Sequence, residues 1–219
     1  GARIYVSSDD SEYMPLRDVA VQSTMGYART ALAGTGITPA CFDRVSTVAV
    51  EVFGGRTLAN ASEADVLAGA NRAYIGGEII GFAVATLTSA GHYTLSTLLR
   101  GLRDTEDAML THVADERFLA LTESGPVVAQ PNLSMLGSAR YFKVVPVGFG
   151  LADVDAATIT PSGRNLRPFA GVGAVGIRVD DGGLTVTWQR QSRALVKCFQ
   201  VSGVPVAETT ELYSVEFWF

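Results

Sequence analysis

The sequence is poor in charged residues and in the residue types that most often build metal or nucleophilic sites. Charged residues make up 18% of its 219 residues, against roughly 25% in typical globular domains. The chain has two histidines, two cysteines and only two lysines, Lys143 and Lys197. The net charge is −5 and no basic cluster occurs, so nucleic-acid recognition is not expected.

Long apolar runs are also missing. A membrane-spanning helix needs about 20 apolar residues, and no stretch approaches that length, so no transmembrane segment is predicted. Hydrophobic residues still make up 47% of the chain, which is enough for a core and excludes wholesale disorder. Cys41 and Cys198 lie far apart and match no metal-binding spacing, so we expect both to be reduced, small apolar residues.

Strand patterns dominate the chain. Residues 47–53 alternate between apolar and polar positions, and Gly54-Gly55 then predicts a hairpin turn into residues 56–58. Residues 78–87 are apolar on both faces, which is typical of a central strand covered on two sides. Further strands are predicted at residues 93–96, 117–121 and 140–147.

Helix is scarce. Ser62 is a good N-cap residue, Asp65 can accept first-turn amides, and Gly69 ends the pattern, so a short helix is expected over residues 62–68. Residues 125–132, which include two prolines, and residues 160–165 are predicted loops.

A domain boundary is predicted at residues 166–168. The expected fold is mainly β: an irregular β-rich domain with one or two short helices over residues 1–165, followed by the start of a small β-sandwich over residues 166–219. Roughly 50 residues follow Pro168, whereas such a sandwich needs about 100. We therefore expect the second domain to be cut, disordered beyond its end, or completed by a neighbour.

The sandwich prediction depends on a hairpin pattern. Val175, Ile177 and Val179 are expected to share one apolar face, and residues 180–183 are expected to form the turn. The returning strand is expected to carry an apolar face with a buried tryptophan, with Thr185, Thr187 and Gln189 pointing outward; its apolar residues are Leu184, Val186 and Trp188. The apolar end, Phe217-Trp218-Phe219, is expected to pack within an assembly or against following residues.

Three motifs have the outline of a ligand site, and the context of each argues against one. Residues 171–176 spell G-x-G-x-x-G, but a strand pattern follows instead of the helix that would hold a pyrophosphate. Residues 180–183 lack the alternating oxygen ligands of a calcium loop. His112, Asp115 and Glu116 have no further histidine nearby for a metal, and they are expected in a solvated loop.

The remaining polar residues are also given structural interpretations. His92 is expected to lie exposed in a hairpin turn. No catalytic, cofactor-binding or metal-binding residue is predicted, and no cofactor. The acidic groups expected to be caps and turns are Asp9-Asp10, Glu63/Asp65, Asp104/Glu106/Asp107 and Glu208/Glu211.

Several stretches together resemble the C-terminal part of the large tail-tip hub protein of long-tailed phages and gene transfer agents. The most specific are LAGANRAYIGGEIIGF at residues 67–82 and YTLSTLLRGLRDTE at residues 93–106, in which Asp104 stands where that family usually has glycine. The tryptophan-containing stretch LTVTWQRQSR at residues 184–193 is also similar to that family. Shorter likenesses are VPVAE at 204–208 and YSVE at 213–216.

The resemblance implies a structural role in a virion and no active site. It implies a homotrimeric ring at the distal end of the tail tube, in contact with other tail-tip and tail-tube proteins and with a host surface receptor or glycan. It also implies a fibronectin type III-like module after residue 166, assembly in the host cytoplasm, and a part in host attachment and genome delivery. A low charge content agrees with a surface that is covered by neighbours.

Two other classes of function are weighed against this one. A carbohydrate-binding module would need exposed aromatic rings as a stacking platform, for which Tyr93, Tyr141 and Trp218 are candidates. A glycan-hydrolysing enzyme would need two acids that converge across a cleft. No spacing in the sequence singles out such a pair, so we expect that the chain is not an enzyme.

Overall fold

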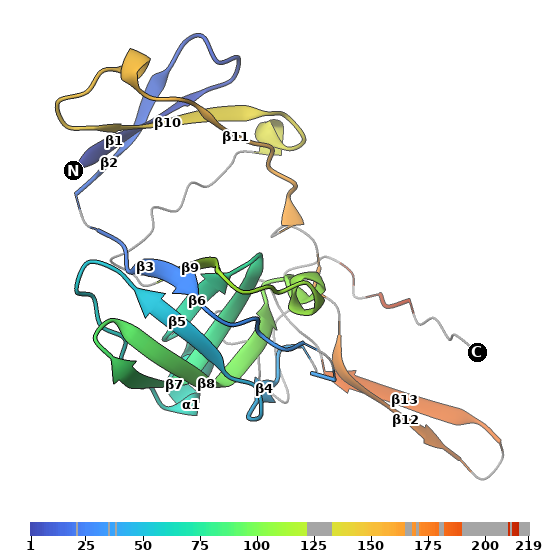
Figure 1. Ribbon diagram of the computed structural model, residues 1–219. Coiled ribbons are helices and arrows are strands. Elements are labelled where there is room, and N and C mark those ends of the chain that lie inside the picture. The colour runs from blue at the N-terminus through green and yellow to red at the C-terminus, as the bar shows by residue number, and fades with distance from the viewer. Residues whose placement is uncertain are drawn as a thin grey trace. The chain divides into compact units, whose positions relative to one another are not determined.

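The computed structural model describes residues 1–20, 22–34, 36–37, 39–121, 133–164, 168–169, 171–179, 182–189, 210 and 212–214. In this part the chain is mainly β, as the sequence predicts, with a single α-helix and short 3₁₀ segments. The chain divides into two compact units, one formed by Gly1–Thr24 with Ala120–Arg164 and the other by Met25–Leu119 with Asn165–Phe219 (Figure 1). The prediction of a domain over residues 1–165 and a sandwich over residues 166–219 stays a prediction.

The first unit is built on an antiparallel sheet with the strand order β11-β10-β1-β2. Its strands come from both ends of the unit, so two distant segments of the chain share one sheet. A bulge between Ile4 and Tyr5 shifts the register of β1 against β2. The strands are β1 (Ala2–Ser7), β2 (Met14–Val19), β10 (Arg140–Pro146) and β11 (Ala157–Ile159), with 3₁₀ turns η2 (Leu133–Met135) and η3 (Leu151–Asp153).

The second unit contains a closed barrel. Its sheet has the order β4-β8-β5-β3-β9-β6-β7, and β7 also pairs with β8, so six strands form a ring and β4 adds to one end of β8. The strands are β3 (Met25–Ala28), β4 (Phe42–Asp43), β5 (Val48–Val52), β6 (Arg72–Ile75), β7 (Glu78–Ser89), β8 (His92–Leu102) and β9 (Glu116–Ala120). Between β8 and β9 lies the 3₁₀ turn η1 (Glu106–Leu110).

The barrel is filled by inward-facing side chains, as expected of a small barrel. Alternation along β5 places its three valines inside and leaves Ala49 and Glu51 half-buried. Closure also removes the exposed strand edges that an open sheet would present. The fully buried apolar side chains include Ala28, Val48, Val50, Ile75, Ile80, Phe82, Leu95, Leu98 and Phe118.

The long hairpin β7–β8 confirms the predicted central strand. β7 pairs with β6 on one side and β8 on the other, and its first half is buried on both faces. The strand predicted at residues 93–96 is also present, but it continues to Leu102. Pairing with β4, β5 and β7 extends this strand beyond the predicted residues 93–96.

The predicted helix is confirmed as α1 (Glu63–Ala68). The Ser62 hydroxyl accepts a hydrogen bond from the Asp65 amide at 3.1 Å, and Gly69 ends the helix in the left-handed conformation at φ 111°. Val66 is the buried residue of α1, and it packs with Ala83, Leu99 and Leu102 of the hairpin.

The hairpin predicted after residue 53 is wrong. Gly54 and Gly55 do form a turn, but residues 56–58 form no strand. Both edges of β5 are already occupied, by β3 and β8, so the following segment cannot pair with it. It instead follows β7, where the Ala61 amide donates to the Ala83 carbonyl.

The hairpin predicted after residue 170 is present as β12 (Val172–Arg178) and β13 (Leu184–Gln189), but its expected faces are wrong. Val175 lies opposite Thr187 and Ile177 opposite Thr185. Opposite residues point to the same face of a sheet, so the apolar residues of the two strands lie on different faces.

The error is one residue of register. Five residues separate Arg178 from Leu184, where the prediction assumed a four-residue turn, and a shift of one residue turns every side chain to the other face. Trp188, expected to be buried, is 37% exposed and contacts Tyr213 edge-on at 5.1 Å between ring centroids. Several predictions fall outside the described residues, namely those for Cys198, the loop at 125–132, Asp180-Asp181, Glu208/Glu211 and Phe217–Phe219.

Within the described residues, the helices are all too short or too polar to span a membrane.

Candidate functional site

Charged side chains are enclosed in the barrel. Arg100 on β8 and Glu78 at the start of β7 are both 0% exposed, and Asp43 on β4 is 4% exposed. Such residues are almost never fully buried unless they are paired. Together with His112 and Glu116 they form one connected group, which we call the charged cluster.

The centre of the charged cluster is a bidentate ion pair between Arg100 and Glu78. Arg100 Nε donates to Glu78 Oε1 at 2.9 Å and Nη2 donates to Oε2 at 2.9 Å. The Gly101 amide also donates to Oε1, at 2.6 Å. The remaining guanidinium nitrogen, Nη1, donates to the Ala33 carbonyl at 2.6 Å and lies 3.3 Å from Asp43 Oδ2. Bidentate charge-assisted pairs of this kind are among the stronger hydrogen bonds in proteins.

Asp43 connects the short strand β4 to this centre. Its second oxygen, Oδ1, accepts hydrogen bonds from the amides of Val45 and Ser46, both at 2.9 Å. The carboxylate therefore orders the turn after β4 on one side and faces the Arg100 guanidinium on the other.

His112 connects the cluster to β9. Its Nε2 lies 2.8 Å from Glu78 Oε2 and its Nδ1 lies 2.6 Å from Glu116 Oε2, and its side chain is 0% exposed. The prediction that His112 lies in a solvated loop is therefore wrong. Met109, three residues earlier in η1, is buried as well. Its side chain packs the segment that contains His112 onto the barrel.

His112, Asp115 and Glu116, which were predicted to share that loop, do not form one group in the structure. Glu116 faces His112, whereas Asp115 turns to Arg29, whose Nη1 lies 2.6 Å from its carboxylate. Among the described residues, no group of three or more His, Cys, Asp and Glu side chains is placed to hold a metal ion. Glu78, which would complete a site with His112 and Glu116, is instead neutralised by Arg100.

The protonation states follow from these contacts. Burial alone would raise the pKa of Glu78, but hydrogen bonds from His112 and Arg100 outweigh it and hold the pKa below the usual value. Asp43 behaves alike: burial opposes its ionisation, and the amide of Ser46 lowers its pKa overall. For His112, burial favours the neutral ring, but hydrogen bonds to Glu78 and Glu116 raise its pKa above the usual value.

Space for the cluster depends on a glycine. Gly76, in the turn between β6 and β7, has φ 52°, and a Cβ added there would lie 2.2 Å from the Glu116 carboxylate. A carboxylate on β9 can thus reach the histidine only because this turn has no side chain. The charged cluster holds β4, β7, β8 and β9 at one place, and its chemistry is that of a structural clamp.

Other residues considered from the sequence lie elsewhere. His92 is half-buried at the start of β8, where exposure was expected, and Cys41 is a free cysteine on the surface. Tyr93 is 5% exposed and cannot serve as a stacking platform; Tyr141 is half-buried, and Trp218 lies outside the described residues. Glu63 and Asp65 lie in the first turn of α1, as expected.

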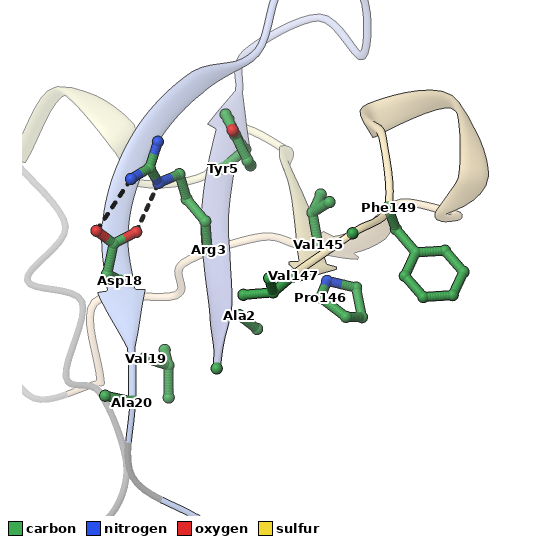
Figure 2. Close-up of a pocket in the computed structure, with 12 residues that line it drawn as sticks. Ala2, Arg3, Tyr5, Asp18, Val19, Ala20, Val145, Pro146, Val147 and Phe149 are labelled. Atoms are coloured by element: carbon green, nitrogen blue, oxygen red, sulfur yellow. Dashed lines mark hydrogen bonds and ion pairs between the residues drawn. The ribbon is translucent and has the colours of Figure 1, made fainter.

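The first unit has a surface hollow of about 390 Å³ at one end of its sheet, shown in Figure 2. Its charged residues are Arg3 and Asp18, neighbours on β1 and β2, with Arg3 Nε 2.5 Å from Asp18 Oδ1. Both side chains are more than half exposed and satisfy each other, so the hollow presents no buried polar group to a ligand. The rest of its lining is largely apolar and includes Val19, Val145 and Phe149. No sequence motif indicates this hollow.

A comparison with known families locates one match. Residues 23–119, less than half of the chain, match the family model described as "Rcc01698-like, C-terminal". The match has nearly the same bounds as the barrel segment Met25–Leu119, and it contains all five residues of the charged cluster. No curated protein matches the chain.

Proposed function

We propose that this chain is a structural component of the tail tip of a long-tailed phage or gene transfer agent. In this role it forms part of a homotrimeric ring at the distal end of the tail tube and contributes to host attachment and genome delivery. It resides in the virion, is assembled in the host cytoplasm, and contacts other tail-tip and tail-tube proteins and a host surface receptor or glycan. It catalyses no reaction.

One observation carries the proposal. The two stretches that most specifically resemble the tail-tip hub family, residues 67–82 and 93–106, form the adjacent strands β6, β7 and β8. Glu78 from the first stretch and Arg100 from the second meet in the buried ion pair. The residues that carry the resemblance are thus the ones that hold the barrel together, as expected if the resemblance reflects a shared structural module.

The chemistry of the barrel supports a structural role. The side chains of the charged cluster are buried and satisfied by each other, so they hold strands together. Large apolar side chains remain on the surface, such as Val45 at 89% exposed and Leu110 at 74%. An assembly protein of low charge would cover such positions with its neighbours.

The test is quantitative mass spectrometry on purified particles, combined with light scattering of the isolated chain. We expect peptides of the barrel in the particle at three copies per tail, and a trimer in solution. Density-gradient fractions without particles serve as the control for contamination. A chain that is absent from particles, or a monomer that never co-purifies with a tail, would contradict the proposal.

A further inference from the structure

The segment between β8 and β9, residues 103–115, packs on the barrel through η1, and we call it the strap. It is fastened at both ends. Near its start, Thr105 Oγ1 donates to the Leu102 carbonyl at 2.6 Å and accepts from the Ile79 amide at 2.9 Å. At its end, the Asp115 amide donates to the Ala28 carbonyl at 2.7 Å.

His112 is the fastening point near the end of the strap. Its two ring nitrogens each face a carboxylate oxygen, and an ionised carboxylate can only accept hydrogen bonds. Both contacts therefore need an N–H, and only the doubly protonated, charged imidazole has two. The neutral ring would leave one carboxylate facing a nitrogen lone pair.

The groups facing His112 decide which contact is lost. Glu78 on β7 is completely buried and keeps its hydrogen bonds from Arg100 and Gly101, while Arg100 in turn faces Asp43 on β4. Glu116 on β9 has a side chain that is 14% exposed and can turn toward water. A neutral His112 would therefore keep the contact with Glu78 and release Glu116.

We propose that His112 is a proton-dependent latch that fastens the end of the strap to β9 through Glu116. When the pH is below the pKa of His112, the ring is charged, the latch is closed and the strap end is ordered on the barrel. Above it, the contact between His112 and Glu116 is lost and residues 110–115 open more often. The contacts with both carboxylates raise the pKa of His112 despite burial, so the latch stays closed to a higher pH than an ordinary histidine would allow and opens as pH rises through that pKa.

The test is amide hydrogen exchange of the whole chain, with protection factors corrected for the intrinsic effect of pH. The reporters are the amides of Thr111 and Asp115, which donate to the carbonyls of Ala108 and Ala28. We expect their protection to fall about tenfold between about pH 6 and about pH 9, following the NMR titration of the His112 ring, because a charge-assisted hydrogen bond is lost. The His92→Gln variant assigns the two histidine signals.

The Glu116→Gln variant distinguishes a pH-dependent contact between His112 and residue 116 from packing of the strap that does not depend on pH. The amide can accept from a protonated Nδ1 or donate to an unprotonated one, so it keeps the contact in both states. Protection in this variant should not change with pH, whereas Asp115→Asn, which removes the exposed pair with Arg29, should lower it equally at both pH values. Protection that stays constant with pH in the unmodified chain, or a full pH dependence in Glu116→Gln, would overturn the proposal.

Discussion

Met25 and Leu119 are direct partners in the antiparallel ladder between β3 and β9. They are the first and last residues of the barrel segment, and beside them the Ala120 amide donates to the Thr24 carbonyl at 2.9 Å. The two ends of the barrel segment thus lie side by side. The first unit is formed by the segments that precede and follow the barrel segment in the chain. This is the geometry of a module inserted into another domain.

The first prediction is that the barrel folds by itself. A fragment of residues 23–121 keeps every strand of the ring and the charged cluster, so it should unfold cooperatively and give a dispersed amide NMR spectrum. A fragment of residues 30–121, which lacks β3, opens the ring and should not fold. A disordered spectrum for the longer fragment would show that the barrel depends on the rest of the chain.

The second prediction concerns the central ion pair. Arg100→Met leaves the Glu78 carboxylate buried without its partner, so the free energy of unfolding should fall by about 3–5 kcal/mol. Urea denaturation monitored by circular dichroism measures this loss. Arg29→Met removes a guanidinium from a solvent-exposed pair and should cost far less.

The double variant Glu78→Met with Arg100→Met checks the cause. Removing both charges takes away the uncompensated carboxylate, so this variant should regain part of the stability lost by Arg100→Met. Equal losses in the single and double variants would mean that the packing of Arg100, and not its charge, supports the barrel.

The third prediction concerns the turn between β6 and β7. Gly76→Ala introduces a Cβ into the space of the Glu116 carboxylate and also adopts φ 52°. Gly55→Ala is the matched control, because its φ is 65° and no atom lies within 4 Å of the added Cβ. The control should cost about 1–2 kcal/mol from the backbone conformation alone. Thermal unfolding should show a larger loss for Gly76→Ala, and equal losses would contradict the steric argument.

The fourth prediction is a stability maximum at mildly acidic pH. The pKa of Glu78 is lower in the folded state than its usual 4.5, so its contribution is present above that value and is lost as pH falls through the folded pKa. The pKa of His112 is raised above 6.5, so its contribution is complete below that value and is lost as pH rises through the folded pKa.

Urea midpoints measured across this pH range should therefore be highest between about pH 4.5 and about pH 6.5. His112→Gln should remove the decline on the alkaline side and leave the acid side in place. A midpoint that keeps rising above neutral pH in the unmodified chain would contradict the charge assignment of His112.

Local patterns in the sequence predicted the elements whose structure is decided locally. Ser62 and Gly69 identify both ends of α1, and the two-sided apolar stretch identifies β7. Asp104 stands where the resembling family has glycine, and it does adopt the left-handed conformation, at φ 63°, that glycine favours. Such features depend on neighbours in the chain, so they can be read from it.

The charged cluster could not be predicted in the same way. Glu78, Arg100 and His112 are far apart in the sequence, and they meet only because the barrel closes and the strap packs against it. A histidine among polar residues has the same local pattern in a solvated loop and in a buried network. The one usable signal was that Glu78 and Arg100 each stand in a stretch resembling the same family.

The most direct test of the structural role is a cryo-EM reconstruction of the tail tip of the native particle. We expect a ring of three copies at the distal end of the tube, with the six-stranded barrel visible in each copy and the Glu78–Arg100 pair enclosed within it. A tail tip that contains no density for this barrel, in a particle whose other proteins are resolved there, would contradict the proposed structural role.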